Sequence, residues 1–173
     1  MKAYVGLLRA VNVGGTGKLP MTELKSMCDV AGFKSARTYI ASGNVVFKSS
    51  LAEAKVKATL EAALAAYAGK PVSVLVRTAE EMAAVLTNNP FPEMPGNRTH
   101  AFFLDKAAPA DALQAVSGQA TEQIGRLRKG TREIYVYYPD GAGASRLKIP
   151  AAKNATARNM NTVAKLAELA AAL

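Results

Sequence analysis

The chain has 173 residues, half of them hydrophobic and a fifth charged, a composition typical of a globular protein with a sizeable core. The net charge of +9 favours anionic partners such as nucleic acid or phosphorylated small molecules. The single cysteine, Cys28, excludes an internal disulfide, and the lack of a secretory leader or of an apolar run of about 20 residues predicts a cytoplasmic protein without a membrane partner.

The first half of the chain predicts the element order strand, helix, strand, strand, helix, strand. Ala3–Leu8 is an apolar run typical of a buried strand, and Leu24, Met27, Cys28 and Ala31 have the spacing of one buried helix face. This order is that of the ferredoxin-like fold, in which an antiparallel four-stranded sheet carries two helices on one face. The predicted ranges are 3–8, 20–31, 37–40, 44–48, 51–68 and 72–77.

The second half predicts a leading helix and then a related βαββα unit. Thr78 and Glu81 have the spacing of a capping box. The predicted ranges are 79–88, 99–104, 109–116, 122–128, 133–138 and 157–173. The fold class is therefore α+β, with a ferredoxin-like lobe at 1–77 and a second lobe at 78–173; the alternative is one compact domain. Residues 139–156 form an eighteen-residue stretch without a regular pattern, and long loops of this kind are often functional.

A glycine-rich stretch, "RAVNVGGTGKLPM" at Arg9–Met21, stands between the first strand and the first helix. It fails the P-loop pattern, because Asn12 replaces a glycine and Leu19 replaces the hydroxyl residue after the lysine. It also fails the dinucleotide fingerprint, because Pro20 stands where the third glycine belongs. Two interpretations remain: anion binding by the turn and Lys18 at the helix start, or a plain strand-to-helix turn.

The inventory of catalytic side chains is small. The single histidine, His100, is expected at a strand start, and Cys28 lies on an apolar helix face. Ser42 lacks a surrounding Gly-x-Ser-x-Gly pattern, and no metal-ligand cluster is evident. The sequence therefore assigns no reaction, no cofactor and no metal.

Basic residues gather between Arg126 and Arg158, where eight of them stand against two acidic ones. Alternation in the predicted hairpin puts two tyrosines on one face beside two arginines, which suits stacking and phosphate contacts with nucleic acid. The alternative is a solvated hairpin edge. The nucleic-acid candidates are Arg126, Arg128, Lys129, Tyr135, Tyr137, Arg146 and Lys148.

A weaker similarity concerns the stretch Tyr39–Phe47, which loosely echoes an RNA recognition module. Such modules stack bases on aromatic side chains of the sheet. Alternation predicts Tyr4 on the open face together with Asn44 and Val46, while Phe47 faces the helices. One aromatic side chain makes a poor platform, so this interpretation is disfavoured.

Three stretches together, "LLRAVNVGGTGKLPMTEL", "RTYIASGNVVF" and "ATARNMNTVAKL", resemble the bacterial domain of unknown function 1697 family. "VLVRT" and "NPF" are similar too, whereas Ala10 and Met160 depart from a usual glycine and tryptophan. The resemblance implies two α+β lobes and brings no established reaction. It points to the matching polar residues Arg9, Asn12, Lys18, Tyr39, Ser42, Asn44, Arg77, Arg158 and Asn159.

In an antiparallel sheet, the end of the first strand lies near the start of the third, which predicts that Asn12–Lys18 lies near Ser42–Asn44. We therefore expect an anion-accepting cleft between these turns, closed by Arg158 at the start of the last helix, for a phosphate-bearing small molecule or nucleotide. The alternatives are nucleic-acid binding and a protein-interaction module; the oligomeric state is not assigned. The anion-site candidates are Arg9, Asn12, Gly14, Gly15, Lys18, Tyr39, Ser42, Gly43, Asn44, Arg158 and Asn159.

Overall fold

The computed structural model describes residues 1–13 and 17–173 and has the α+β fold that the sequence predicts. The described chain forms two four-stranded antiparallel sheets and divides into two compact units. The first unit comprises residues 1–83 and 165–173, and the second comprises residues 84–164.

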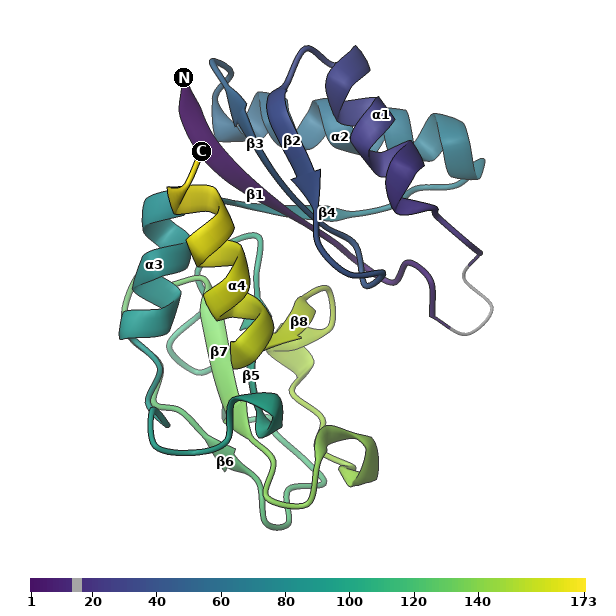
Figure 1. Cartoon of the computed structure of the whole chain (residues 1–173). Helices are drawn as coiled ribbons and strands as arrows, with labels where there is room; N and C mark the ends of the chain where they lie inside the picture. The colour runs from purple at the N-terminus through teal and green to yellow at the C-terminus, as the bar shows by residue number, and fades with distance from the viewer. Residues whose placement is uncertain (14–16) are drawn as a thin grey trace. The chain divides into compact units, whose positions relative to one another are not determined.

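The first unit has the predicted ferredoxin-like topology. Its strands are β1 (Lys2–Leu8), β2 (Lys34–Thr38), β3 (Asn44–Ser49) and β4 (Val74–Thr78), and its helices are α1 (Met21–Val30) and α2 (Glu53–Ala68). The strand order is β2-β3-β1-β4, with both helices on one face of the sheet (Figure 1). This order places the loop after β1 beside both the loop before β3 and the loop before β4.

The core of this unit lies between the sheet and the two helices. Phe33 stacks on Phe47 with ring centroids 4.4 Å apart, and Leu60 and Leu64 of α2 are buried in the same cluster. Each fully buried side chain of this kind stabilises the fold by about 1.5–3 kcal/mol. Cys28 belongs to this cluster, where burial raises the pKa of its thiol to about 12. It therefore packs as a small apolar residue.

The expectation that Tyr4 lies on the open face of the sheet is wrong. Tyr4 pairs with Phe47 across the strands, so both side chains face the helices. The Tyr4 hydroxyl donates a 2.8 Å hydrogen bond to the Leu51 carbonyl, and burial raises its pKa. The Tyr4 ring is therefore not available for stacking on the open face of the sheet.

The second unit repeats the strand order of the first. Its strands are β5 (Thr99–Phe103), β6 (Gln123–Ile124), β7 (Glu133–Tyr137) and β8 (Thr156–Asn159), in the order β6-β7-β5-β8. Helix α3 (Ala79–Thr87) follows β4 directly, and α4 (Met160–Ala171) follows β8. Each of these helices belongs partly to both units, because the boundaries fall after Ala83 and before Lys165. Short 3₁₀ turns occur at η1 (Gly96–Arg98), η2 (Ala142–Ala144) and η3 (Pro150–Ala152).

Three elements predicted for the second half differ in the structure. The strand predicted at 122–128 is reduced to Gln123–Ile124. Residues 109–116 form turns rather than a helix. They cover the sheet as part of an irregular layer, in which Leu113, Leu147 and Ile149 pack against the buried cluster that contains Ile134 and Val136. The last helix begins at Met160 rather than at 157, because the four residues before it pair with β5 as β8. The irregular loops therefore occupy the face that helices cover in the first unit.

The two sheets end in the same local arrangement. Arg77 of β4 and Arg158 of β8 are both buried, and each donates a 2.9 Å hydrogen bond to the carbonyl of the preceding residue. The next residue, Thr78 or Asn159, then caps the following helix by accepting an N–H bond three residues on. The two sheets therefore share their strand order and also the buried arginine and the helix N-cap at the end of the last strand.

The stability of the second unit is expected to depend on His100. Its Nδ1 is buried without a hydrogen-bond partner among the described residues, and its ring meets Tyr138 edge-on at 5.2 Å. Burial lowers the pKa of His100 below 6.5, so as the pH falls through 6.5 the unfolded chain takes up a proton first and the folded state loses stability.

We therefore expect the Tm of the wild type to fall between about pH 7 and about pH 5 by more than that of His100→Phe, which keeps the aromatic contact. Thermal denaturation followed by circular dichroism checks this. Parallel Tm curves for the two proteins would contradict the assignment.

Candidate functional site

The loop after β1 and the loop before β3 meet in the first unit. The Leu8 N–H donates a 2.8 Å hydrogen bond to the Gly43 carbonyl, directly beyond the Leu7–Asn44 pair of the two strands. Gly43 has φ +91°, and a Cβ there would lie 2.6 Å from Cγ2 of Val11. The two loops therefore approach so closely that position 43 requires glycine.

The side-chain amide of Asn12 holds these loops together. Its Nδ2 donates to the Leu19 carbonyl at 2.9 Å and to the Ala41 carbonyl at 2.8 Å, while its Oδ1 accepts the Leu19 N–H at 2.7 Å. Asn12 has φ +54°, a conformation that asparagine adopts more readily than most residues. These bonds make Asn12 a structural clamp that joins both ends of the glycine-rich loop to the neighbouring turn.

The Tyr39–Asn44 turn uses its polar groups internally. Nδ2 of the fully buried Asn44 donates to the Tyr39 carbonyl at 2.9 Å and to Oγ of Ser42 at 3.0 Å. The Tyr39 N–H donates to the Asn44 carbonyl at 2.9 Å. Of the predicted anion-site residues, Tyr39, Ser42, Gly43 and Asn44 therefore shape and support the turn.

A cavity of about 550 Å³ lies beside the glycine-rich loop, on the side of α2 and β4. The loop contributes Arg9 and Lys18, the turn after α2 contributes Lys70, and none of the described lining residues is acidic. The remaining lining residues are Ala10, Val11, Gly17, Leu19, Leu64, Tyr67, Ala68, Pro71, Val72 and Ser73. The wall opposite Arg9 and Lys18 is thus the end of α2 and the segment that follows it, in place of the expected Ser42–Asn44 turn.

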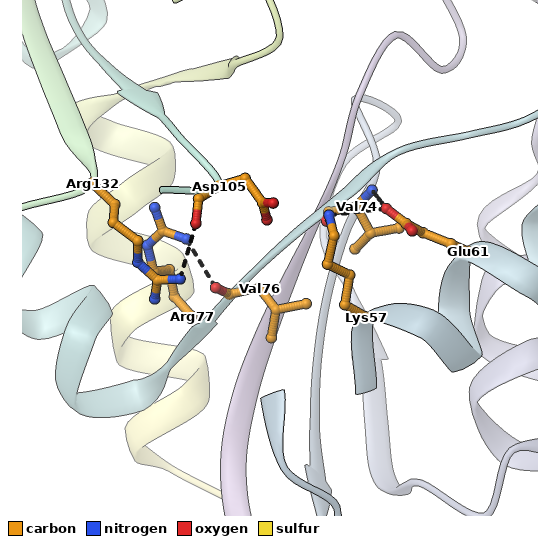
Figure 2. Close-up of polar contacts among 7 residues, drawn as sticks. All are labelled: Lys57, Glu61, Val74, Val76, Arg77, Asp105 and Arg132. Carbon is orange, nitrogen blue, oxygen red and sulfur yellow. Dashed lines mark hydrogen bonds and ion pairs between the residues drawn. The ribbon is translucent and has the colours of Figure 1, made fainter. Parts of the chain in front are cut away.

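Hydrogen bonds join α2 to the start of β4, next to the wall that lies opposite Arg9 and Lys18. Nζ of Lys57 donates to the Val74 carbonyl at 2.6 Å and pairs with Oε1 of Glu61 at 2.9 Å, while Glu61 accepts the Val74 N–H at 3.0 Å. Figure 2 shows these two α2 side chains against the start of β4 and, further along the strand, Arg77 on the Val76 carbonyl. The Arg9 N–H also donates to the Ser73 carbonyl at 2.9 Å, so strand pairing continues to the cavity rim.

The charge of the cavity is positive. The carboxyl end of α2 contributes a partial negative charge of about half an electron, against three full positive charges. One of the terminal carbonyls, that of Ala65, already accepts the N–H of Gly69. The formal charge of the three basic side chains therefore exceeds the partial charge of the helix end.

Arg158 and Asn159, two further predicted anion-site residues, are not among the residues that line this cavity. Arg158 belongs to β8 in the second unit, where Nη1 donates to Oγ1 of Thr156 at 2.7 Å, and burial lowers its pKa to about 10. The expectation that it stands at the start of the last helix is wrong, because Asn159 is the N-cap of α4. Gly14 and Gly15 lie outside the described residues.

One of the two tyrosines predicted to stack on nucleic acid, Tyr135, is buried. Tyr135 is 8 % exposed and its hydroxyl donates to the Val85 carbonyl at 2.7 Å, so its ring packs beneath α3 and burial raises its pKa. Tyr137 contacts Phe91 at 6.1 Å, and Nη1 of Arg128 donates to Asn88 at 2.9 Å. The exposed basic candidates are Arg126, Arg128, Lys129, Arg146 and Lys148. These residues keep the positive charge of the hairpin and loop without the expected pair of stacking rings.

Sequence reasoning missed Lys70 and Tyr67. The signal was available in the topology, because β1 pairs with β4 as well as with β3, and Leu8 stands opposite Val74. The same argument that placed the Ser42 turn beside the glycine-rich loop therefore also places residues 70–73 beside it. Helix spacing adds Tyr67, since Leu64, Tyr67 and Ala68 share one face of α2.

The chain is similar to a family of known proteins and to a solved structure. The sequence profile of "Protein of unknown function (DUF1697)" matches residues 1–135. The solved structure of conserved bacterial protein SP0830 from Streptococcus pneumoniae is similar over 98% of each chain, with a TM-score of 0.78 and 24% identity, a likeness of fold alone. A search of curated proteins gave no match. Within residues 1–13 and 17–173, no helix has the length and apolar character needed to cross a membrane.

Gly17 and Gly43 form a matched pair for testing the close approach of the two loops. Both have φ near +90°, at 89° and 91°, but an added Cβ at Gly17 meets nothing within 4 Å. We expect Gly17→Ala to lower the free energy of unfolding by about 1–2 kcal/mol through backbone strain. Gly43→Ala should cost about 1–3 kcal/mol more because it also overpacks Leu8 and Val11. Equal costs in urea denaturation would contradict this packing.

The Asn12 clamp can be separated from its backbone conformation. Asn12→Gly tolerates the positive φ but loses three hydrogen bonds of about 1 kcal/mol each, so we expect it to cost about 2–3 kcal/mol. Asn12→Ala adds the strain and should cost about 1 kcal/mol more. A loss below about 0.5 kcal/mol in both variants, measured by urea denaturation, would show that the amide does not hold the loops.

Proposed function

This chain belongs to the DUF1697 family of proteins of unknown function, and we propose that it binds a phosphate-bearing small molecule in the cavity lined by Arg9, Lys18 and Lys70. The observation that carries the proposal is the convergence of three basic side chains, from two separate segments, on one cavity whose described lining holds no acid. The volume of about 550 Å³ lies within the usual range for small-molecule sites.

The charge of the cavity suits a phosphate better than a carboxylate. A phosphate ester carries a charge of about −1.5 to −2 at neutral pH, so it balances more of the three positive charges than a carboxylate does. The guanidinium of Arg9 offers a planar fork for two phosphate oxygens, while Lys18 and Lys70 add point charges. Val11, Leu19 and Leu64 are buried beneath them and give the site an apolar floor.

Hydrogen bonds between described residues hold two of the segments beside the cavity. In this account the Asn12 amide positions the segment that carries Lys18, and the Lys57–Glu61–Val74 bonds position the start of β4 beyond Lys70. A preorganised site loses less conformational entropy when the ligand binds. We also propose a cytoplasmic location, in keeping with a single buried thiol at Cys28.

The test is isothermal titration calorimetry with inorganic pyrophosphate as the probe. Lys18→Gln and Lys70→Gln should each weaken binding by about three- to ten-fold, equivalent to about 0.7–1.4 kcal/mol for a partly screened charge contact. Lys34→Gln is the matched control, because Lys34 is exposed on β2 and outside the cavity lining. Wild-type affinity in both cavity variants, or an equal loss in the control, would contradict the proposal.

A further inference from the structure

The walls of the cavity differ in chemistry. The glycine-rich loop presents Arg9 and Lys18, whereas α2 presents Leu64, Tyr67 and Ala68 from one helix face. Lys70 stands in the turn where the helical wall ends. A bound molecule therefore meets cations on one side and an apolar, aromatic surface on the other.

Tyr67 is the notable member of the helical wall. The residue is 47 % exposed, although Leu64, one turn earlier on the same face, is buried in the core. A tyrosine ring offers a large rigid surface on which a planar group can stack. Inorganic phosphate alone would leave that ring in water, so the cavity is better matched by a ligand that has both a phosphate and a ring.

Building on the proposed function, we propose that the ligand is a nucleoside monophosphate whose phosphate lies among Arg9, Lys18 and Lys70 and whose base stacks on Tyr67. The described lining contains no carboxylate that would select the amino groups of one base. Recognition of the base therefore rests on stacking, which tolerates any base and favours purines by their larger ring area. We expect adenosine and guanosine monophosphates to bind alike and uridine monophosphate to bind less tightly.

Stacking of a base on an aromatic side chain corresponds to a gain of about five- to a hundred-fold in affinity. Adenosine 5′-monophosphate should therefore bind at least about five-fold more tightly than ribose 5-phosphate, which carries the same phosphate without a base. Adenosine, which lacks the phosphate, should bind more weakly than either.

The experiment measures the affinities of these three compounds by calorimetry for the wild type, Tyr67→Phe and Tyr67→Leu. Tyr67→Phe keeps a stacking ring and should retain the preference for adenosine monophosphate over ribose 5-phosphate. Tyr67→Leu should bring the two phosphates to the same affinity and leave that of ribose 5-phosphate unchanged. The position is exposed on a helix, and equal Tm values would show that the variants fold alike.

The outcomes separate the two proposals. Equal affinity of the wild type for adenosine monophosphate and ribose 5-phosphate would overturn the nucleotide assignment and leave the phosphate site standing. A Tyr67→Leu variant that weakens both phosphates equally would do the same, because it would show that Tyr67 does not act on the base. Failure of both phosphates to bind, or binding of adenosine as tightly as its monophosphate, would overturn the phosphate site as well.

Discussion

The side-chain amide of Asn12 is the constraint on which the candidate site depends. Through one donor group and one acceptor it joins Leu19, at the end of the glycine-rich loop, to the Ala41 carbonyl in the neighbouring turn. Leu19 is thereby held in the core at 6 % exposure, and Lys18, the residue before it, is placed at the cavity rim. The segments on either side of the glycines, at Asn12 and at Lys18–Leu19, are thus joined by one local side chain, and the charge of Lys18 lies at the rim of the cavity.

The ferredoxin-like topology then decides which residues meet. Because β1 lies between β3 and β4, the end of β1 has a neighbouring loop on either side. The β3 side is filled by hydrogen bonds within the Tyr39–Asn44 turn and by the contact of Gly43 with Val11. The β4 side is open, and there the cations of the loop face the end of α2. The β3 side therefore supports Asn12 at the start of the loop, and the cavity lies on the β4 side.

Local sequence patterns predicted the first unit well because its helices and strands are long and bury continuous apolar faces. They failed at a strand that forms only by pairing with a distant segment, and at a predicted helix that the structure does not contain. The four residues of β8 are a strand only because they pair with β5, and residues 109–116 have helix-forming composition but fold into turns, as in the Ala112 N–H bond to the Pro109 carbonyl.

The side assignment of Tyr4 failed for a related reason. Residues Tyr4–Leu8 are all buried, so alternation gives no indication of which face meets the helices. In the site, the proximity of the Asn12 and Ser42 turns followed from strand order alone. The place of Arg158 did not, because its strand was not predicted.

The most direct measurement of the central claim is a ¹⁵N–¹H spectrum of the labelled protein during titration with pyrophosphate. We expect shifts of the backbone amides of residues that line the cavity, namely Arg9, Gly17, Lys18, Lys70 and Ser73. Shifts confined to Arg126–Thr131 of the second unit, or to the Ser42–Asn44 turn, would contradict it.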